Sequence, residues 1–452
     1  MKIAIIGLGL EGRDVIKYFA DKNIEVTVLD RKPVEELDAT GIDIKRVKFV
    51  TGEDYLANLD SYDVVYRSPG VYRYLPELIK AEKSGVKISS ATQLFFEQCP
   101  GQIIGVTGTK GKGTTSTLIY EILKMAGKDV YLVGNIGKPS LELLPQLTPE
   151  SYVVMEMSSF QLIDMTKSPQ VAVVLNVTVD HLDWHKNREE YVVAKQNLVL
   201  HQKPTDLAVI NFDYPTSKNF AKLTKGQVVY FSRFGKPGIG TYVEDGKIII
   251  NDVKQKMIVG NTDKLLLRGE HNWENVNAAV SATYFSGVDP KTIAKVVFAF
   301  KGLEHRLELV GNWKGVTFYN DSFSTNPQPT MAGVDSFIEP LTLILGGSDK
   351  GLDYDELGQY LTKKGNIKNV ILIGQIAPVI KSSLEKAKFT GKIIDLGMTT
   401  MKEIVQTCVK ETVKGGVVLL SPATASFGMF TDYKDRGYQF KKEVGLLKRD
   451  EQ

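Results

Sequence analysis

The chain alternates short apolar runs with amphipathic segments from its first residues onward. A β-branched run at residues 2–6 ends in a glycine turn, a helix-like segment follows at 13–21, and a second strand-like run covers 25–30. A third such run, 63–66, ends at a Ser-Pro-Gly turn. This order predicts a β-α-β unit. The alternation fades near Cys99, where we place a domain boundary.

A second α/β unit follows this boundary. The apolar run 102–106 turns through a segment rich in glycine and lysine, and then continues into a helix with apolar residues at helical spacing. The run 229–267 alternates β-forming residues with glycine, which predicts an antiparallel insertion on the central sheet. The other elements predicted in this unit are strands at 152–157, 171–177 and 207–211, and helices at 274–287 and 291–300.

The alternation restarts near Gly302, with strands predicted at 316–319, 342–345, 369–373, 392–396 and 417–420. Strands that alternate with helices form mainly parallel sheets covered on both faces. A chain of 452 residues also exceeds one ordinary hydrophobic core. We therefore predict an α/β fold of three domains: a Rossmann-like domain at 1–98, a central P-loop ATPase-like domain with a mainly parallel sheet at 99–301, and a Rossmann-like domain at 302–452.

Composition narrows the class of protein. Hydrophobic residues make up 43% and charged residues 24%, as in an average soluble protein, and no run is long and apolar enough to predict membrane insertion. The net charge of +3 comes from scattered basic residues, so no nucleic-acid partner is expected. The two cysteines, Cys99 and Cys408, have no close-spaced partner, which favours a reducing compartment and a cytoplasmic location. Small charged metabolites are the expected ligands.

The first candidate site is the turn Gly7-x-Gly9-x-x-Gly12, which follows a strand, with Asp30 at the end of the next strand. These glycines let the backbone approach a diphosphate, and the helix that follows offers free N–H groups and positive partial charge. Taken alone, the motif fits a nicotinamide or flavin enzyme equally well. A tight strand-to-helix turn without any ligand is the structural alternative.

The segment Gly108-Thr109-Lys110-Gly111-Lys112-Gly113-Thr114-Thr115 carries a more specific signal. Its backbone amides can cradle phosphate oxygens, Lys112 can neutralise the β- and γ-phosphates, and a threonine hydroxyl can hold magnesium. The spacing is shorter than the Walker pattern, because the residue five positions before Gly111 is Val106. This combination favours ATP as the nucleotide.

For three further side chains, the sequence leaves the role open. Glu156 ends an apolar run, so it is either a buried magnesium ligand beside the phosphate loop or an edge-strand residue that faces water. His181 follows another β run, where a core or capping role is the commoner outcome. Lys195 lies on a predicted helix, and by itself it is expected to be a solvated surface lysine.

Taken together, these motifs resemble the Mur ligase family over essentially the whole chain. The segments SSFQL and SPATAS point, within that family, to the branch that adds D-glutamate. The matching segments are GLGLEG, SPG at 68–70, GTKGK, GNIG at 134–137, EMSSFQL at 156–162, NVTVDHLDWH at 176–185, the segment 191–195, EHNWENVNA at 270–278, GLEHR at 302–306, NDSFSTN at 320–326, GGSDKG at 346–351 and LLSPATASF at 419–427.

The resemblance implies an ATP-dependent, carbon–nitrogen bond-forming ligase of peptidoglycan precursor synthesis. The alanyl carboxylate of UDP-N-acetylmuramoyl-L-alanine would attack the γ-phosphate of ATP, and D-glutamate would displace phosphate from the acyl phosphate. Lys112 and two Mg²⁺ ions would supply the charge neutralisation that this step requires. By similarity, Thr114 and Glu156 would hold one ion, and His181 with a carbamylated Lys195 would hold the other. Lys112, His181 and Lys195 form the implied catalytic set.

The resemblance also distributes the binding residues over the chain, which is expected to act as a monomer. The implied UDP-sugar site comprises Gly7, Gly9, Leu10, Gly12, Asp30, Arg31, Ser68, Pro69, Gly70, Asn135, Ser158 and Ser159. ATP would contact Gly108, Thr109, Lys110, Gly111, Lys112, Gly113, Thr114, Thr115, Asn275, Arg306 and Asp321. D-Glutamate would contact Thr325, Lys350, Ser426 and Tyr433.

Three residues depart from the family pattern. Gly113 separates the phosphate-loop lysine from the first threonine, Phe323 stands where many members have lysine, and Glu11 stands where many have a small polar residue. The closest alternative is another amino-acid-adding ligase, either a different Mur ligase or a folylpolyglutamate synthase. A nucleotide-sugar or nicotinamide oxidoreductase would leave the second phosphate loop unused, and a non-catalytic nucleotide-binding scaffold is the remaining alternative.

Overall fold

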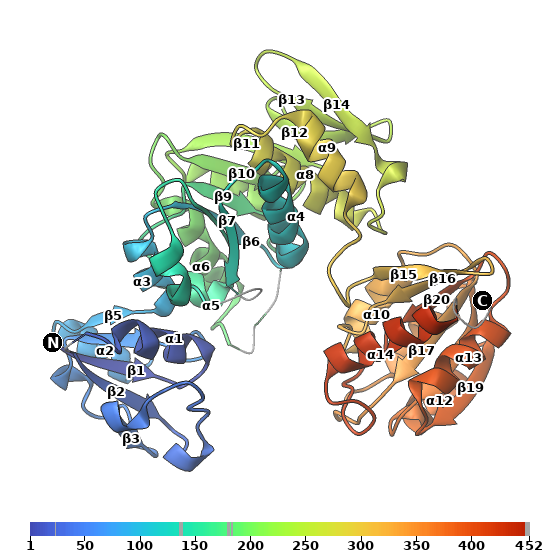
Figure 1. Cartoon of the computed structure of the whole chain (residues 1–452), viewed down its shortest axis with the longest axis horizontal. Helices are drawn as coiled ribbons and strands as arrows, with labels where there is room; N and C mark the ends of the chain where they lie inside the picture. The colour runs from blue at the N-terminus through green and yellow to red at the C-terminus, as the bar shows by residue number, and fades with distance from the viewer. Residues whose placement is uncertain (23, 135–138, 179–180, 182–183, 448–452) are drawn as a thin grey trace. The chain divides into compact units, whose positions relative to one another are not determined.

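The computed structural model describes residues 1–22, 24–134, 139–178, 181 and 184–447 (Figure 1). These residues form two compact units. The first contains Met1–Asp263 and Trp273–Val297, and the second contains Lys264–Asn272 and Phe298–Gln452. The first unit holds two sheets and the second holds one, and all three are mixed α/β with mainly parallel pairing. The predicted fold class is confirmed, while the bounds 1–98, 99–301 and 302–452 stay predictions.

The N-terminal sheet is entirely parallel, with the order β3-β2-β1-β4-β5. Alternate residues of β1 point to opposite faces: Ile3 and Ile5 pack with helices α1 and α3, and Ala4 and Ile6 pack with helix α2. Its elements are β1 (Lys2–Ile6), α1 (Leu10–Phe19), β2 (Glu25–Asp30), β3 (Lys48–Thr51), β4 (Val64–Arg67), α2 (Pro76–Lys83), β5 (Lys87–Ser89) and α3 (Ala91–Gln98).

The central sheet has nine strands in the order β14-β13-β12-β11-β10-β9-β6-β8-β7. Helix α4 packs against β6, β7 and β8, and α6 packs against β6. The elements are β6 (Gln102–Thr107), α4 (Lys112–Met125), β7 (Val130–Gly134), β8 (Tyr152–Glu156), α5 (Ser159–Leu162), β9 (Val171–Val174), α6 (Arg188–Leu200), β10 (Leu207–Asn211), α7 (Pro215–Lys218), β11 (Gln227–Ser232), β12 (Gly240–Glu244), β13 (Lys247–Asn251), β14 (Lys256–Asn261), α8 (His271–Tyr284) and α9 (Pro290–Ala299).

The predicted antiparallel insertion at 229–267 is partly wrong. Strand β11 pairs in parallel with both β10 and β12, and antiparallel pairing begins only between β12 and β13. Alternating β-forming residues specify which face a side chain occupies but not the direction of the neighbouring strand, so the pattern did not distinguish the two pairings.

The sheet of the second unit has the order β15-β16-β20-β17-β18-β19, and only β15 pairs antiparallel. Helices α10, α11 and α12 pack in one core cluster, and α13 and α14 pack in the other. The elements are β15 (Glu308–Trp313), β16 (Val316–Asn320), α10 (Pro327–Val334), β17 (Leu341–Gly346), α11 (Asp355–Thr362), β18 (Ile367–Ile373), α12 (Ala377–Lys386), β19 (Lys392–Gly397), α13 (Met401–Glu411), β20 (Val417–Leu420) and α14 (Tyr433–Leu446).

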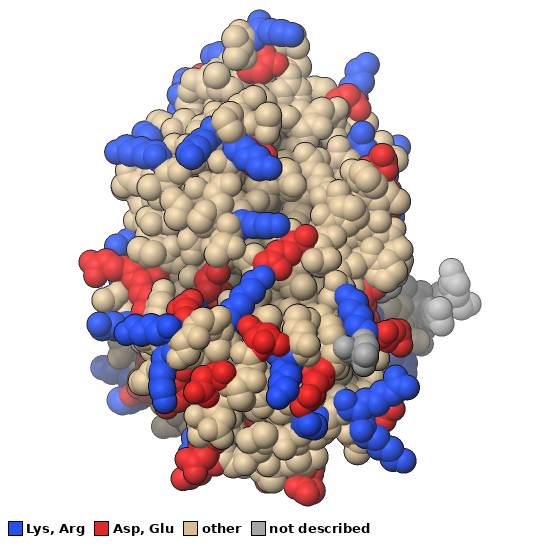
Figure 2. All heavy atoms as spheres, turned by 90° about the vertical axis from the view of Figure 1, so that its left-hand side faces the viewer, with Lys and Arg blue, Asp and Glu red and all other residues tan. Residues whose placement is uncertain are grey.

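Two further observations concern helix hydrophobicity and surface charge. None of the helices within the described residues is long and apolar enough to cross a membrane. On the face shown in Figure 2, lysine and arginine side chains interleave with aspartate and glutamate.

Candidate functional site

The glycine turn after β1 is built as its sequence predicts. Gly7 has φ +87°, its N–H donates to Leu29 O at 2.9 Å, and its carbonyl accepts from Ser68 Oγ at 2.9 Å. A Cβ atom at Gly12 would lie 2.3 Å from the Gly7 carbonyl oxygen, so helix α1 can pack this closely only with glycine there. Gly9 has open space around it and directly precedes α1.

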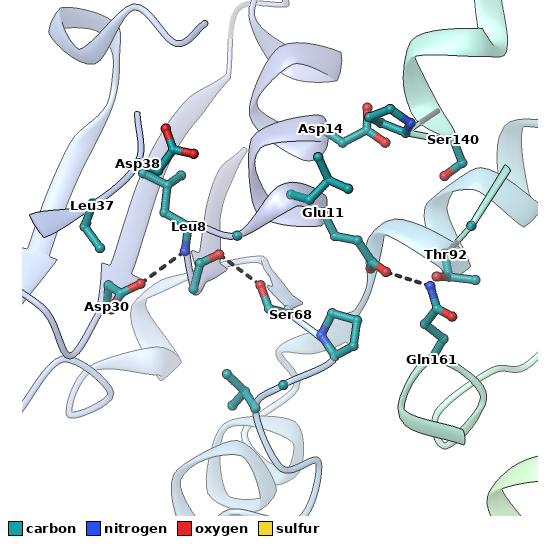
Figure 3. A pocket seen from close by; sticks show the side chains of 18 of the residues that line it. Leu8, Glu11, Asp14, Asp30, Leu37, Asp38, Ser68, Thr92, Ser140 and Gln161 are labelled. Carbon is teal, nitrogen blue, oxygen red and sulfur yellow. Dashed lines mark hydrogen bonds between the residues drawn. The ribbon is translucent and has the colours of Figure 1, made fainter. Parts of the chain in front are cut away.

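This turn opens into a pocket of about 760 Å³ (Figure 3). Gly7, Gly9, Leu10, Asp30 and the turn 68–70 all line it, so the structure brings most of the predicted UDP-sugar residues together. The free N–H groups and the positive end of the dipole at the start of α1 suit a diphosphate.

Two of the predicted residues, Asp30 and Arg31, differ in how they relate to the pocket. Asp30 lines the pocket but also holds its turn, because its carboxylate accepts from Leu8 N at 3.1 Å and from Lys32 N at 3.0 Å. Arg31 is exposed and lies outside the lining, where the neighbouring Lys32 is found instead.

The pocket also has acidic walls. Glu11, Asp14, Glu36 and Asp38 line it together with Asp30. Burial raises the pKa of Glu11 to about 7 and that of Asp14 to about 6. The Asp14 carboxylate accepts the backbone N–H groups of Leu141 at 2.9 Å and Glu142 at 3.2 Å, which ties α1 to the central part of the unit.

Helix α5 contributes the opposite wall of the pocket through Gln161. Ser158 caps this helix in a capping box with Gln161, and Ser158 is only half-buried. Ser159 is buried, and its Oγ lies 2.8 Å from His185 Nε2. Neither serine lines the pocket, and Asn135, which was predicted for the same site, lies outside the described residues.

The second predicted turn joins β6 to α4. Gly111 adopts the left-handed conformation with φ +86°, and a Cβ there would lie 2.1 Å from Asn275 Oδ1. Thr115 Oγ1 donates to the same oxygen at 3.4 Å, so Asn275 packs directly on the loop. Lys112 Nζ donates to the carbonyls of Gly108 at 3.1 Å and Thr109 at 3.2 Å. The lysine thus occupies the concave side of a loop whose shape suits phosphate.

The rest of the loop is fixed by the strand ends beside it. Thr109 Oγ1 lies 2.9 Å from the Tyr191 hydroxyl and accepts from Thr178 N at 3.0 Å. Lys110 is exposed, and its backbone N–H donates to Asn176 Oδ1 at 3.0 Å. Gly113 is buried in the first turn of α4.

The residues predicted to bind the first metal ion lie near this loop. Glu156 ends β8 directly beside Val106 of β6, and only 8% of it is exposed. Its Oε2 is buried and has no hydrogen-bond partner among the described residues. Thr114 is half-buried, whereas Thr115 is fully buried. A buried carboxylate oxygen with an open coordination position fits a hard cation such as Mg²⁺.

The structure contradicts the interpretation of Lys195 as a solvated surface lysine. It is 1% exposed, and its Nζ donates to Thr107 Oγ1 at 3.2 Å and to Gly108 O at 3.1 Å. The Tyr191 ring centroid lies 4.7 Å from Nζ. Lys195 belongs to the buried stripe of α6, at i+4 from Tyr191 and directly after buried Ala194. That helical spacing is the sequence signal that would have predicted its burial.

His181 is exposed, has φ +54°, and packs its ring 4.8 Å from that of Phe160. Its neighbours 179, 180, 182 and 183 lie outside the described residues. Within the described part of the chain, no three His, Cys, Asp or Glu side chains are grouped to hold a metal ion.

The predicted residues of the second unit form two clusters. The Asp321 carboxylate is buried, accepts from Ser324 Oγ at 2.6 Å and Ser421 Oγ at 2.7 Å, and has its pKa raised by burial to about 6. The Arg306 guanidinium carbon lies 3.9 Å from the centroid of the Phe323 ring, so the aromatic residue supports the cation.

Only some of the residues predicted to bind D-glutamate contact one another. Lys350 Nζ donates to Thr325 O at 3.5 Å, and Lys350 is exposed. The Tyr433 ring lies 5.1 Å from that of Phe323. Ser426 is buried, and its carbonyl accepts from Phe430 N at 3.1 Å.

Sequence reasoning missed the residue that connects two of these motifs. Arg436 is fully buried, and its guanidinium donates to Ser322 O and Ser322 Oγ, both at 2.9 Å, and to Thr424 O at 3.2 Å. It therefore ties the segment 320–326 to the segment 419–427. The polar surroundings of Arg436 in the sequence gave no sign of its burial. The role of His185 was also missed, because its neighbours in the sequence are mainly polar as well.

The comparisons with known proteins cover nearly the whole chain. Three family models match: "Mur ligase MurD-like, N-terminal domain" at residues 1–90, "Mur ligase middle domain" at 106–283, and "Mur ligase, glutamate ligase domain" at 305–424. Two relatives named UDP-N-acetylmuramoylalanine--D-glutamate ligase are similar over 99% of this chain. The protein of Acetivibrio thermocellus is 40% identical over 96% of its own length, and that of Ruminiclostridium cellulolyticum is 38% identical over 97%.

Solved structures with lower identity share the fold. UDP-N-acetylmuramate-alanine ligase MurC of Thermotoga maritima matches with a TM-score of 0.58 at 17% identity, over 100% of both chains. MurF of Acinetobacter baumannii matches with a TM-score of 0.59 at 16% identity, over 98% of this chain and 93% of that one. From the three matching family models and the two near full-length relatives, the chain belongs to the Mur ligase family.

Proposed function

We propose that this protein joins D-glutamate to UDP-N-acetylmuramoyl-L-alanine at the expense of ATP, in peptidoglycan precursor synthesis. The observation that carries the proposal is the presence of two phosphate-type turns in one compact unit: the pocket around Gly7–Gly12 and the loop around Gly108–Thr115. An oxidoreductase would need only the first of them. The near full-length relatives that bear this enzyme's name support the choice of substrates.

The reaction has two steps. A carboxylate oxygen of the alanyl group attacks the γ-phosphorus of ATP, the bond to the bridging oxygen breaks, and ADP leaves. The amine nitrogen of D-glutamate then attacks the acyl carbon, and phosphate leaves as the amide forms and a proton is lost. Both steps bring anions together, so cationic groups at the γ-phosphate are the main requirement.

Lys112 meets this requirement in our proposal. Its ammonium now bonds to the Gly108 and Thr109 carbonyls at the mouth of the loop. A bound triphosphate offers anionic acceptors in place of neutral carbonyls, and charge-assisted hydrogen bonds are the stronger ones. Asn275, which contacts the loop through Gly111 and Thr115, is well placed to contact ATP.

Two Mg²⁺ ions complete the proposed ATP site. Glu156 and Thr114 would hold one, and His181 with a carbamylated Lys195 would hold the other. The Lys195 ammonium would first lose a proton, and the neutral amine would then react with carbon dioxide to give a carbamate and release a second proton. This would replace a cation with an anion that offers two oxygen donors. The ions supply charge neutralisation at the phosphates when bound.

The remaining assignments rest on the resemblance and on the chemistry of the side chains. Arg306 and Asp321 contact ATP, and the ammonium of Lys350 pairs with the side-chain carboxylate of D-glutamate, as expected for a charge-assisted bond. Thr325, Ser426 and Tyr433 surround the same amino acid. We propose that the enzyme acts as a cytoplasmic monomer.

Phosphate release from ATP tests this function when both co-substrates are present. We expect release only with UDP-N-acetylmuramoyl-L-alanine and D-glutamate together. L-Glutamate is the matched control for the amine, and UDP-N-acetylglucosamine is the control for the nucleotide sugar, because it lacks the alanyl carboxylate. Release that requires a different amino acid would contradict the proposal and favour another ligase of the family.

A further inference from the structure

The wall of the nucleotide-sugar pocket contains one carboxyl group in an unusual setting. Glu11 is the second residue of α1, at the helix end where the diphosphate is proposed to bind. Its Oε1 accepts from Gln161 Nε2 at 2.7 Å, as Figure 3 shows. Its Oε2 is buried and has no hydrogen-bond partner among the described residues. A buried carboxylate with a single hydrogen bond is costly, whereas a neutral carboxylic acid requires much less solvation.

We propose that Glu11 is a ligand-binding residue of this pocket, and that the pocket binds its anionic nucleotide sugar most tightly when the Glu11 carboxyl carries a proton. The inference rests on the proposed function, because it takes a diphosphate diester as the ligand. A protonated Glu11 is neutral and can donate a hydrogen bond, whereas an ionised Glu11 repels the diphosphate at close range. Ligand binding therefore takes up a proton whenever Glu11 is ionised in the free protein.

The charged groups around Glu11 leave its protonation close to balance near neutral pH. Burial raises the pKa of Glu11 most strongly, to about 7, against the lowering effects of the Gln161 hydrogen bond and the Arg67 guanidinium. Asp14 on its own helix and Asp164 beyond α5 raise it further.

Other charges line the pocket around this group. They are Asp30, Lys32, Glu36 and Asp38. Counting Asp14, the lining has four carboxylates besides Glu11. Asp38 pairs with Arg13, and the other three face one lysine, so the lining as a whole disfavours an additional negative charge on Glu11.

The direction of the pH effect follows from linkage. The dianionic diphosphate of the ligand favours protonated Glu11, so binding raises the pKa of this group above its value of about 7 in the ligand-free protein. Tight binding is fully present below this pH and is lost as the pH rises through it. A single linked proton gives at most about a tenfold loss of affinity per pH unit. The diphosphate diester and the alanyl carboxylate of the ligand are both ionised over this range.

Calorimetric titration of the full-length protein with UDP-N-acetylmuramoyl-L-alanine, without ATP, tests the proposal. Between about pH 7 and pH 8.5, where Asp14 with its pKa of about 6 stays mainly ionised, we use buffers with different ionisation enthalpies. We expect the affinity to fall with pH and proton uptake to approach one per ligand at the alkaline end. The isosteric variant Glu11→Gln keeps a neutral donor. Its affinity should be independent of pH, without proton uptake, and should exceed that of the wild type at alkaline pH.

Glu36→Gln is the matched control, since it removes an exposed carboxylate from the same lining and should titrate like the wild type. Wild-type binding that is independent of pH would overturn the proposal, as would unchanged proton uptake in Glu11→Gln. These results would leave the pocket assignment intact. Absence of binding at every pH, in wild type and variant alike, would overturn both the assignment and the role of Glu11. The wild-type titration is decisive by itself if the variant fails to fold.

Discussion

Lys195 shows how one side chain can change the chemistry of the proposed ATP site. Its amine is buried against Thr107 and the Gly108 carbonyl, where the phosphate loop leaves β6. Burial of a lysine beside a phosphate loop is expensive unless its charge is used or removed. The proposed carbamate removes the cation and places oxygen donors at this position.

We expect Lys195→Ala to lose about a hundredfold or more in ligation rate, because a metal ligand is missing. Formate or acetate that enters the vacated space should restore a measurable part of the rate. The matched control is Lys112→Ala, which should be equally inactive but gain nothing from either anion, since it lacks a cation rather than an oxygen donor. Steady-state rates with and without the acids, together with circular dichroism to confirm folding, decide the matter. Wild-type activity of Lys195→Ala without any acid would disprove the carbamate.

At the scale of the elements, glycine has two different roles in the turn between β1 and α1. Gly12 is required by the fold, because a Cβ there would collide with the Gly7 carbonyl oxygen at 2.3 Å. Gly9 has an ordinary φ of −80° and open space around it, so the fold itself does not require glycine at this position. The space beside Gly9 belongs to the pocket where the ligand is proposed to bind.

Alanine at Gly12 should therefore affect stability, whereas alanine at Gly9 should affect ligand binding. Gly12→Ala should destabilise the protein by about 1–3 kcal/mol, as overpacking does, and lower its melting temperature. Gly9→Ala should melt like the wild type and yet bind UDP-N-acetylmuramoyl-L-alanine more weakly, because its methyl group occupies space that the diphosphate needs. Differential scanning fluorimetry with and without the ligand measures both properties. Equal behaviour of the two variants would contradict this division of roles.

Sequence patterns predicted strands whose β-forming residues follow one another without interruption. The run 417–420 forms β20 within those bounds, and 25–30 forms β2. They missed β15, whose sequence ELVGNW is interrupted by glycine and polar residues, and the three-residue β5. Both missed strands are sheet edges with few consecutive apolar positions, so their pattern is too weak to detect.

Prediction of the site was limited because contacts between residues far apart in the sequence leave no local pattern. The two glycine turns are local, and each lies between a strand and a helix as predicted, although α1 begins at Leu10 and not at residue 13. Phosphate binding at both turns stays a prediction. The bond between Glu11 and Gln161 spans 150 positions, and nothing in either segment indicates it. Lys195 was misinterpreted because lysine is rarely buried, although the spacing of its neighbours on α6 marked the buried face.

For the whole molecule, the proposed UDP-sugar residues that the structure describes all belong to the first compact unit. The second unit has its own sheet and core clusters. A ligand that binds only the folded form of one unit stabilises that unit alone, by about 2.7 kcal/mol at one hundred times its dissociation constant.

Calorimetry should accordingly show two unfolding transitions. UDP-N-acetylmuramoyl-L-alanine should raise the temperature of one transition and leave the other in place, and the variant Gly9→Ala should reduce this shift. A single transition that moves as a whole with the ligand would show that the two units unfold together, which is the contrary outcome.

The acidic lining of the nucleotide-sugar pocket has a consequence for the speed of binding. Among its described residues, Lys32 is the only cation, while Glu36 and Asp38 are exposed carboxylates, of which Asp38 pairs with Arg13 outside the lining. Carboxylates still outnumber cations, so the incoming ligand, which carries a diphosphate and a carboxylate, is repelled until it reaches the backbone N–H groups at the start of α1. Dissolved ions screen charges over about 10 Å at 0.1 M ionic strength. Added salt should thus accelerate association, whereas salt slows the capture of anions by cationic sites.

Stopped-flow fluorescence can follow this, because the Trp184 indole N–H donates to Gly70 O at the pocket rim. The association rate should rise with ionic strength in the wild type and respond less when Glu36 and Asp38 are both replaced by their amides. A rate that falls with salt would mean that attraction governs the encounter. If the expected result holds, this ligase draws in its nucleotide sugar faster as the surrounding solution becomes more saline.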